Sequence, residues 1–473
     1  MSSPSTVPLL VSGQWHTSAV RVPAFSPFDG TPVAEVCEST PELLHGALVA
    51  ARAAAAGVAA VPARERAAIL RRAAEAVRRE AETIARTMAA ETGKPLRDGR
   101  VEVLRSAETL ELSAEEAVRI EGAHVPMEAS AIGAGKLGVV LRFPVGVVAA
   151  ITPFNAPVNL TAHKLGPAWA AGNAVILKPS PQAALSVHRF IETLLEGGVP
   201  RAWLQTVQGD AAAAAIVQAD EVDFVSFTGS SRVGAIVKAS SGLKRVALEL
   251  GGNGFTIVTE DAPADAALTC ARNATRLAGQ SCISVQNVLV HRSGQRAFAD
   301  AMAAHARALR LGDPMHEDTD VGPVISAASA QRIQRMVDEA VAAGARLLCG
   351  GRHDGALFHP TVLADVPPGC PVVDDEVFGP VVSVLPYDSL DEAIARVNAG
   401  PYGLQAGIYT QSMPLAMKAA MSLRMGAVIV NGSSTWRSDQ APYGGTKASG
   451  MGREGPRFAI RDMTEERFIV FNA

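Results

Sequence analysis

Cys282 and Glu249 are the residues of this sequence whose types and surroundings best suit them to chemistry. Cys282 lies in the small, polar, glycine-led stretch Gly279-Gln280-Ser281-Cys282-Ile283-Ser284, and Glu249 lies 33 positions earlier, at the end of an apolar segment that is followed by two glycines. A thiol becomes a strong nucleophile when a neighbouring base assists it, and a carboxylate can be that base. If the two segments face each other, the sequence predicts an enzyme that forms a thioester on Cys282.

Composition and charge argue against several other classes of function. The 473 residues carry a net charge of −4 and no basic block, so neither nucleic-acid nor membrane-surface binding is indicated. The five cysteines show no CxxC or metal-ligand spacing, and the N-terminus lacks a secretory signal. We therefore expect no bound metal and a reduced, cytoplasmic protein. The alanine-rich run at 48–60 is interrupted by Arg52 and is expected to be a buried helix rather than a membrane span.

The segments that must position these residues alternate between strand and helix patterns. Continuous apolar runs at 145–151, 173–177 and 224–227 are typical of strands buried on both faces, and helical segments at 158–171 and 182–196 lie between them. This order predicts a doubly wound, parallel sheet in an α/β fold. A second alternation, from about 254 to 430, predicts another α/β domain. Helices are also expected at 41–92 and 99–119.

Two stretches at the expected carboxyl ends of these strands suit a nucleotide. Phe227-Thr228-Gly229-Ser230 follows a buried strand and opens a helix, so free N–H groups and hydroxyls there could meet a pyrophosphate. Ordinary helix capping by Ser230 is the alternative. Lys178 ends the preceding strand, at the edge where doubly wound folds bind ligands, and could bond ribose hydroxyls or be a solvated surface lysine.

Taken together, the motifs of the chain resemble those of the aldehyde dehydrogenase superfamily over nearly the full length. Each motif is weak alone, but their common order and spacing are specific. The matching stretches are Thr152-Pro153-Phe154-Asn155, Gly172-Asn173 with Leu177-Lys178-Pro179-Ser180, Phe227-Thr228-Gly229-Ser230, Leu248-Glu249-Leu250-Gly251-Gly252, Gly279-Gln280-Ser281-Cys282, Glu376-Val377-Phe378-Gly379-Pro380, and Pro442-Tyr443-Gly444-Gly445-Thr446-Lys447.

The resemblance implies catalytic roles for five residues. Cys282 matches the nucleophile, Glu249 matches the general base, and Asn155 matches the side chain that forms an oxyanion hole with the Cys282 backbone N–H. Lys164 and Glu454 match positions proposed to assist proton movement. The implied reaction is the oxidation of an aldehyde to a carboxylic acid through a thiohemiacetal and a thioester.

The resemblance also implies a nicotinamide cofactor, NAD or NADP. In the family pattern Lys178 meets the adenosine ribose, Ser230 the pyrophosphate and Glu376 the nicotinamide ribose, while Phe378 packs near the nicotinamide ring. The full set of implied cofactor-binding residues is Ile151, Thr152, Phe154, Lys178, Ser180, Pro181, Gly229, Ser230, Val233, Leu250, Gly251, Glu376 and Phe378.

The family architecture implies three parts for this chain. Residues 1–122 and 144–248 are expected to form a Rossmann-type cofactor domain, and residues 249–440 a catalytic α/β domain. Residues 123–143 and 456–473 are expected to form a small β oligomerisation arm, which implies a homodimer or a homotetramer.

Two details favour a sub-class within the family. Relatives that pass the acyl group to coenzyme A generally lack the glutamate found here as Glu249, so hydrolysis to the free acid is favoured. The stretches 279–287 and 434–439 are most similar to the lactaldehyde and phosphonoaldehyde dehydrogenase branch. Ala156 stands where many relatives have an aromatic residue, which would widen the substrate tunnel.

Pro181 bears on the choice between the two cofactors. It occupies the position at which NAD-preferring relatives often carry a glutamate, whose charge would repel the 2′-phosphate of NADP. Without that repulsion we expect NADP to be tolerated.

Two arginines are candidates for holding an anionic group of the aldehyde. Arg437 precedes the Pro442-Tyr443-Gly444 motif, and Arg105 lies on a helix expected to line the opposite wall; guanidinium groups suit carboxylates and phosphonates. The alternative is local ion pairing of Arg437 with Asp439 and of Arg105 with Glu102 or Glu108. Next to the thiol, Ser281 and Ile283 complete the expected substrate contacts. Ser281 replaces an arginine found in some phosphonoaldehyde relatives, which weakens the case for a phosphonate.

Two other functions stay open at this point. One is a semialdehyde dehydrogenase that transfers the acyl group to coenzyme A. The other is a catalytically idle binding protein on the same fold, which the presence of Cys282, Glu249, Asn155 and Glu376 argues against.

Overall fold

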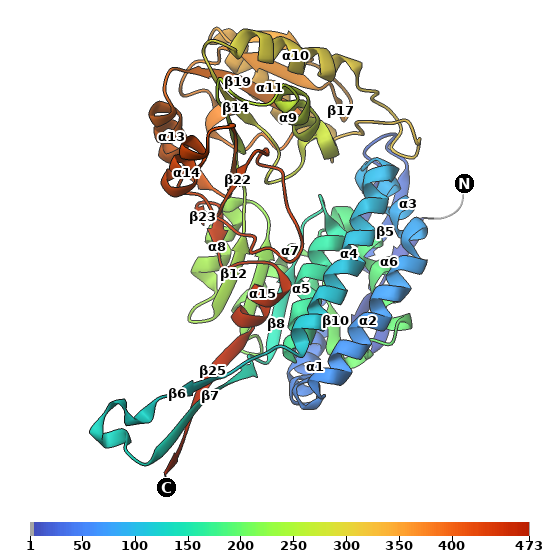
Figure 1. Cartoon of the computed structure of the whole chain (residues 1–473). Helices are drawn as coiled ribbons and strands as arrows, with labels where there is room; N and C mark the ends of the chain where they lie inside the picture. Colours follow the sequence, from blue (N-terminus) through green and yellow to red (C-terminus); the bar gives the residue numbers. More distant parts are fainter. Residues whose placement is uncertain (1–3, 473) are drawn as a thin grey trace.

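The apolar runs form the strands of two α/β bodies that lie against each other. The computed structural model describes residues 4–472, and Figure 1 shows the two bodies with a long β-arm that projects from the lower one. The fold class expected from the sequence is confirmed.

The first sheet has the strand order β10-β9-β8-β11-β12-β24, and its strands are parallel except for the edge strand β24. The register pairs Ile151 with Lys178 and Thr228 with Glu249, so the carboxyl ends of four strands meet at one edge. The strands are β8 (Val147–Ile151), β9 (Ala174–Lys178), β10 (Leu204–Thr206), β11 (Phe224–Thr228), β12 (Arg245–Glu249) and β24 (Gly450–Met451).

Helices cover both faces of this sheet, as a doubly wound fold requires. Helix α5 begins at Pro157, whose fixed φ suits a first turn, and ends before Gly172, which has a φ of 93°. The segment predicted as one helix at 182–196 is a 3₁₀ turn, η3 (Pro181–Ala183), followed by α6. The helices are α1 (Pro41–Ala60), α2 (Ala63–Arg79), α3 (Ala81–Thr92), α4 (Leu96–Ala117), α5 (Pro157–Ala171), α6 (Ala184–Glu196), α7 (Asp210–Gln218) and α8 (Ser231–Ser240).

The second sheet has the strand order β15-β18-β19-β14-β13-β21-β22 and is parallel except for β15. Its strands are β13 (Phe255–Val258), β14 (Asn287–His291), β15 (Arg346–Cys349), β18 (Thr361–Ala364), β19 (Val381–Tyr387), β21 (Gln405–Tyr409) and β22 (Ala427–Val430). Its helices are α9 (Ala266–Thr275), α10 (Gln295–Ala308), α11 (Ala327–Ala342), α12 (Pro371–Asp374), α13 (Leu390–Ala399) and α14 (Met413–Ser422).

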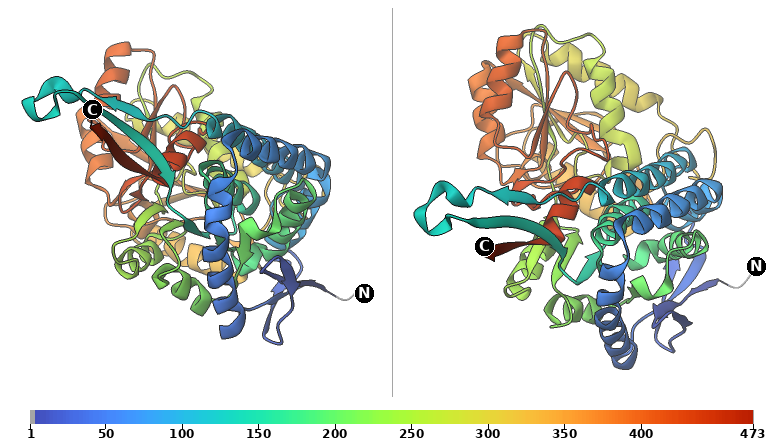
Figure 2. Two further views of the ribbon diagram at one scale, coloured as in Figure 1. Left: turned by 90° about the horizontal axis from the view of Figure 1, so that it is seen from below. Right: turned by 60° about the horizontal axis from the view of Figure 1, so that its bottom comes forward.

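The arm is a three-stranded antiparallel sheet in the order β25-β7-β6. Both views of Figure 2 show it extending away from the two bodies. Strand β25 pairs with β7 along its whole length, from Thr464 opposite Pro144 to Asn472 opposite Lys136. The strands are β6 (Ala123–Val125), β7 (Lys136–Pro144) and β25 (Thr464–Asn472), and helix α15 (Pro456–Asp462) leads into the last of them.

The N-terminal residues form short strands beside the first body. They are β1 (Ser5–Val7), β2 (Leu9–Val11), β3 (Gln14–His16), β4 (Arg21–Phe25) and β5 (Pro32–Cys37). Two further two-stranded pairs complete the second body and its boundary, namely β16 (His353–Asp354) with β17 (Leu357–Phe358), and β20 (Tyr402–Gly403) with β23 (Thr446–Lys447).

Helix α1 contains the alanine-rich run and is, among residues 4–472, the one helix long and apolar enough to cross a membrane by length and composition. The sequence predicted a buried helix, but α1 is buried on one face only. The prediction is therefore wrong for the rest of the helix surface. The buried face packs into the core of the first body through Ala47, Leu48, Ala51, Ala55 and Val58.

Candidate active site

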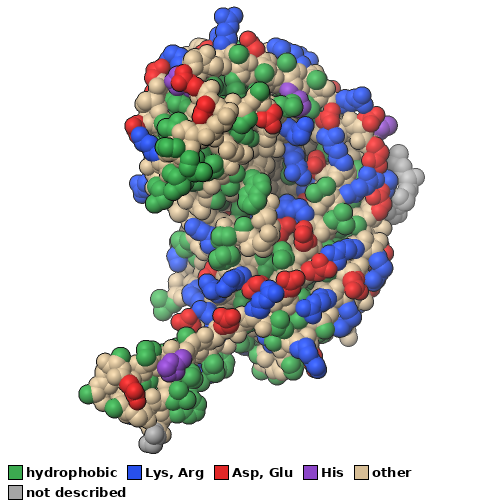
Figure 3. Space-filling model, viewed as in Figure 1, with side chains coloured by type: hydrophobic (Ala, Val, Ile, Leu, Met, Phe, Trp, Pro, Cys, Tyr) green, Lys and Arg blue, Asp and Glu red, His purple; other side chains and the backbone are tan. Residues whose placement is uncertain are grey.

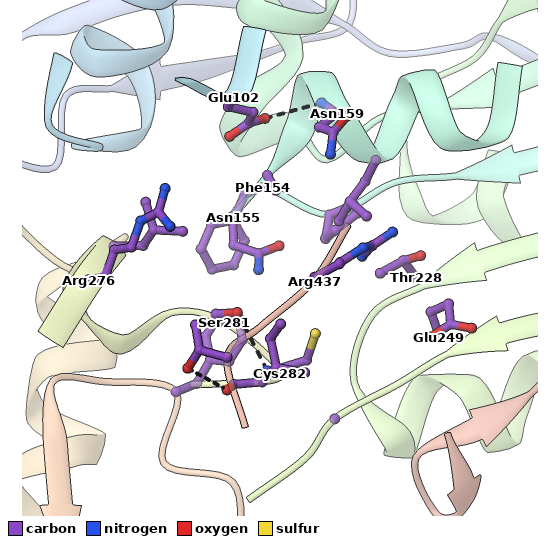
Figure 4. Close-up of a pocket in the computed structure, with 18 of the residues that line it drawn as sticks. Glu102, Phe154, Asn155, Asn159, Thr228, Glu249, Arg276, Ser281, Cys282 and Arg437 are labelled. Atoms are coloured by element: carbon purple, nitrogen blue, oxygen red, sulfur yellow. Dashed lines mark hydrogen bonds between the residues drawn. The ribbon is translucent and has the colours of Figure 1, made fainter. Parts of the chain in front are cut away.

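Cys282 and Glu249 line the same cavity, of about 420 Å³, between the two bodies. Figure 3 shows the hollow at this boundary with Lys and Arg side chains on its rim, and Figure 4 shows the side chains inside it. The predicted residues that line the cavity are Arg105, Phe154, Asn155, Gly229, Ser230, Glu249, Leu250, Gly251, Ser281, Cys282, Ile283, Glu376, Phe378, Arg437 and Glu454. Among residues 4–472, no three His, Cys, Asp or Glu side chains are placed to hold a metal ion.

A sharp turn presents Cys282 to the cavity. After helix α9, Leu277, Ala278 and Gly279 have φ values of 55°, 52° and 69°, in the left-handed region that side chains disfavour. A Cβ at Gly279 would lie 1.9 Å from the carbonyl oxygen of Gly379, so only glycine fits. A Cβ at Gly252 would lie 2.6 Å from the carbonyl oxygen of Cys282. Glycines therefore let the second body bring the thiol close to the carboxyl end of β12.

The thiol of Cys282 lies in surroundings that oppose its ionisation. Burial raises the pKa of Cys282 to about 12, and the charges of Glu376 and Glu249 add to the rise. The hydroxyl of Tyr443, 2.8 Å from the Cys282 Sγ, and the charge of Arg437 act in the opposite direction. Tyr443 belongs to the motif Pro442-Tyr443-Gly444-Gly445, from which no role for its hydroxyl was predicted.

Glu249 ends β12 with both carboxylate oxygens buried and without a hydrogen-bond partner in the described chain. Burial raises the pKa of Glu249 well above 4.5, and the charge of Glu454 raises it further, against Arg437 and Lys164. A Cβ at Gly444 would lie 2.8 Å from the Glu249 Oε1, so glycine at 444 makes room for the carboxyl. A carboxylate of raised pKa is a stronger base once it ionises.

Asn155 lies between β8 and α5 and points its amide toward the Cys282 loop. Its Nδ2 donates to the carbonyl oxygen of Gln280 over 2.9 Å. An amide nitrogen carries two N–H groups, so one bond fixes the side chain and the other N–H is left for a ligand.

Lys164, Glu454 and Arg437 form a buried charge cluster at the wall of the cavity. Lys164 Nζ lies 3.2 Å from the Glu454 Oε1, and Arg437 Nη2 donates to Oε2 over 2.9 Å. Burial pulls the pKa of Glu454 up, but the charges of Lys164 and Arg437 overcome it and lower the pKa to about 2. Lys164 does not itself line the cavity and reaches it through Glu454.

Both candidate anchor arginines have carboxylate partners, but not those considered from the sequence. Arg105 pairs with Asp439 rather than Glu102 or Glu108, and Arg437 pairs with Glu454 rather than Asp439. Asp439 also accepts from the amide of Asn159 over 3.2 Å and lies 2.9 Å from the Nε2 of His163. Glu102 instead pairs with the buried Lys94 and accepts from the first N–H groups of α5.

Arg276 is a cavity residue that the sequence analysis missed. It follows helix α9 six positions before Cys282, and its side chain is exposed. Its Nε donates to Asp98 over 3.2 Å, and its Nη groups have no protein partner among residues 4–472. Figure 4 shows Arg276 and Glu249 on opposite sides of Asn155 and Cys282. The sequence feature that could have identified Arg276 as a site residue is its short separation from Cys282.

The cavity also reaches the N-terminus of α8 and the Glu376 carboxylate. Gly229 and Ser230 line it at the N-terminus of α8, where backbone N–H groups favour a pyrophosphate. A Cβ at Gly251 would lie 2.5 Å from the Glu376 Oε2, and the Gly252 N–H donates to Oε1 over 3.0 Å. These close approaches place the Glu376 carboxylate, whose pKa burial raises to about 7, in the cavity wall. A Cβ at Gly229 would lie 2.5 Å from the Phe227 ring, so glycine at 229 and 251 makes room for the Phe227 and Glu376 side chains.

Phe154 and Phe378 face each other edge to face in this wall, with ring centroids 5.9 Å apart. Phe378 adopts a φ of 47°, uncommon for a bulky side chain.

Six predicted cofactor residues lie outside the cavity, along the carboxyl edge of the first sheet. Thr152 donates its N–H to the carbonyl oxygen of Lys178. The Lys178 amino group is buried. Burial lowers its pKa, while the charges of Asp210 and Glu38 raise it. Pro181 is exposed at the start of η3. The six residues are Ile151, Thr152, Lys178, Ser180, Pro181 and Val233.

A doubly wound sheet whose carboxyl edge faces a buried thiol and carboxylate is typical of a dinucleotide-dependent enzyme. Residues 15–469 match the model of the aldehyde dehydrogenase family. The chain belongs to this family and is an NAD(P)-dependent aldehyde dehydrogenase.

Two relatives indicate the branch of the family. The 3-sulfolactaldehyde dehydrogenase of Priestia aryabhattai is 42% identical over 467 residues, which cover 98% of each chain. The lactaldehyde dehydrogenase of Methanococcus vannielii is 39% identical over 417 residues, 86% of this chain and 88% of that one. These matches confirm the expected resemblance to a lactaldehyde-like branch.

Solved structures share the whole fold. Aldehyde dehydrogenase 21 of Physcomitrella patens, in complex with the reaction product succinate, superimposes with a TM-score of 0.96 at 35% identity and covers 100% of this chain and 99% of that one. An NADP-dependent glyceraldehyde-3-phosphate dehydrogenase from Bacillus halodurans C-125, complexed with NADP, gives 0.96 at 32% identity, with 100% of both chains covered.

Proposed function

We propose that this protein oxidises a small anionic aldehyde to the carboxylic acid through a covalent intermediate on Cys282. The proposal that the aldehyde is anionic rests on Arg276. Its guanidinium lines the cavity that holds the thiol, and its Nη groups have no protein partner among residues 4–472. Guanidinium groups bind carboxylate, sulfonate and phosphonate oxygens through paired hydrogen bonds.

Arg105 and Arg437 add positive charge to the same cavity. Arg105 shares its charge with Asp439, and Arg437 shares its charge with Glu454 but keeps a buried Nε–H without a partner in the described chain. We assign Arg276 as the principal anchor, and Arg105 and Arg437 as secondary ones. Ser281 and Ile283 would contact the chain of the aldehyde beside the thiol.

In the first step, the Cys282 thiol releases its proton to water, the thiolate adds to the aldehyde carbon, and the carbonyl electron pair moves to oxygen. The free N–H of the Asn155 amide and the Cys282 backbone N–H would stabilise that oxyanion. One such donor typically contributes about 3–4 kcal/mol to the barrier. Fixing the Asn155 amide on Gln280 prepares the donor before the substrate arrives.

The nicotinamide cofactor supplies a hydride acceptor when it is bound. Glu376 would hold the nicotinamide ribose and Phe378 the ring, while Gly229 and Ser230 would meet the pyrophosphate and Lys178 the adenosine ribose. Loss of hydride from the adduct leaves a thioester on Cys282. Pro181 leaves the adenosine end open to NADP as well as NAD.

Glu249 would then activate the water that cleaves the thioester. Its raised pKa makes it an effective base, and the carboxylic acid that it becomes can return the proton to the departing Cys282 sulfur. The product is a free carboxylic acid, and Cys282 is regenerated.

The test is a panel of short aldehydes in matched pairs that differ in an anionic or a neutral end group, assayed with both cofactors. The panel should include lactaldehyde, carboxylate semialdehydes, and sulfonate and phosphonate aldehydes. We expect kcat/KM to favour the anionic member of each pair. Equal values would reject the anion specificity, and formation of acyl-coenzyme A on addition of coenzyme A would favour the acylating function instead.

We further propose that the arm joins copies of this chain into a homodimer or homotetramer in the cytoplasm. The outer strand β25 leaves an unpaired edge, and the arm exposes Leu137, Leu141, Phe468 and Phe471. Light scattering on the purified protein should report a dimer or larger species, and a monomer would reject the proposal.

A further inference from the structure

Tyr443 is fixed between the predicted nucleophile and the buried charge cluster. Its backbone N–H donates to the Glu454 carbonyl over 3.1 Å, and the Glu454 N–H donates back over 2.6 Å. This bridge holds the ring, which is 5% exposed, in a small apolar cluster with Ile283 and Leu404 that packs against Cys282. The side chain therefore has one defined position beside the thiol.

The two ends of the Tyr443 side chain make different contacts. Its hydroxyl oxygen lies 2.8 Å from the Cys282 Sγ, and the guanidinium carbon of Arg437 lies 3.8 Å from the ring centroid. A cation on the face of an aromatic ring draws electron density from it, which makes the attached hydroxyl a better donor. Arg437 is held in that place by Glu454.

We propose that Tyr443 is a catalytic residue whose hydroxyl donates a hydrogen bond to the Cys282 thiolate, with Arg437 strengthening the donor through the ring. The role rests on the proposed function of Cys282 as the nucleophile. During attack the sulfur lone pair forms the C–S bond and the carbonyl pair moves to oxygen, while Tyr443 keeps its proton.

The charges around the thiol show why such a donor is needed. Glu249 and Glu376 both oppose a negative sulfur, and Arg437 favours it. Glu454 lies behind Arg437 and takes up part of its charge. The Tyr443 hydroxyl is the neutral donor at the sulfur itself, and it stays protonated because burial and the Cys282 charge raise the pKa of Tyr443 well above 10.

Tyr443→Phe separates this role from packing, because phenylalanine fills the same place between Arg437, Ile283 and Leu404. The measurement is the rate of alkylation of Cys282 by iodoacetamide against pH, in the protein without cofactor or aldehyde, followed by mass spectrometry of the Cys282 peptide. Cys282→Ala provides the blank. Tyr409→Phe is the matched control, since this buried tyrosine lies on β21 and contacts neither Cys282 nor Arg437.

We expect the alkylation rate at each pH between about 7 and 9 to fall about tenfold or more in Tyr443→Phe and to stay unchanged in Tyr409→Phe. Arg437→Lys, which keeps a charge but loses the flat stack, should give a smaller fall. An unchanged rate in Tyr443→Phe, with circular dichroism and melting temperature like the wild type, would overturn the proposal. Because the assay uses no aldehyde, a failure of the substrate proposal would leave this result intact.

Discussion

Asp439 holds Arg105 at two points, with the Arg105 Nε and Nη2 donating to its two oxygens over 3.0 and 2.7 Å. The pair ties the loop before Tyr443 to helix α4, across 334 positions of sequence. His163 and Asn159 bond to the same carboxylate, which is buried. The shape of the substrate cavity thus depends on one aspartate.

Asp439→Asn should therefore destabilise the protein. Removing the charge leaves Arg105 without its partner in a partly buried site, so we expect the free energy of unfolding to fall by about 2–4 kcal/mol. Urea titration measures this. Asp388→Asn is the matched control, because Asp388 and its partner Arg292 are both exposed, so the loss of this ion pair should have little effect. Equal losses in both variants would show that the Asp439 network adds no special stability.

Arg276→Gln should weaken the binding of anionic aldehydes. A lost charge-assisted hydrogen bond corresponds to roughly a tenfold to hundredfold rise in KM, with kcat little changed, because the anchor acts in the ground state and the transition state alike. Steady-state kinetics on a matched neutral aldehyde should show little effect. Arg272→Gln, an exposed arginine one turn earlier on α9, serves as the control. A similar rise for neutral and anionic aldehydes would remove Arg276 from the anchor role.

Glu249→Gln should separate hydride loss from hydrolysis. Without the base, the thioester should accumulate, which gives a rapid burst of reduced cofactor followed by turnover slower by about a hundredfold. Rapid-mixing absorbance measures the burst, and mass spectrometry detects the acyl group on Cys282. Cys282→Ala should show neither burst nor turnover. A slow first turnover in Glu249→Gln would mean that Glu249 acts before the hydride step.

Acid should remove the contribution of Glu454 to stability. The charges of Lys164 and Arg437 outweigh burial and lower its folded pKa to about 2, from an ordinary value of 4.5. A carboxyl with a depressed folded pKa stabilises the fold above its unfolded pKa and loses that contribution as the pH falls through the folded value. The difference in unfolding free energy between wild type and Glu454→Gln should therefore shrink from about pH 5 toward about pH 3. A constant difference over that range would contradict the charge-cluster assignment.

Pro181→Glu should shift cofactor use toward NAD. A carboxylate at this exposed position, near the adenosine end, would repel a 2′-phosphate, so we expect KM for NADP to rise roughly tenfold while KM for NAD stays within about twofold. Gln182→Glu adds the same charge one residue away and tests whether position matters. If both cofactors respond equally, the cofactor does not approach Pro181 as proposed.

The sequence by itself determined the parts of the site that follow from local pattern. Apolar runs at 145–151, 173–177 and 224–227 predicted parallel strands, and parallel strands bring their carboxyl ends to one edge. The sequence also singled out the glycine-containing stretches around Glu249 and Cys282, and the structure has close backbone approaches there. These features depend on backbone conformation and strand order, which short segments encode.

Only the tertiary structure decided which charged groups meet. Arg105 pairs with Asp439, and Arg437 pairs with Glu454, rather than with the partners considered from the sequence. The reason is that the loop carrying Arg437 crosses the pocket and presents its side chains to helices α4 and α5. Tyr443 reaches the Cys282 thiol from 161 positions away for the same reason. The partner of a long charged side chain depends on which groups the fold brings near it and on how deeply they are buried. The spacing of residues along the chain determines neither.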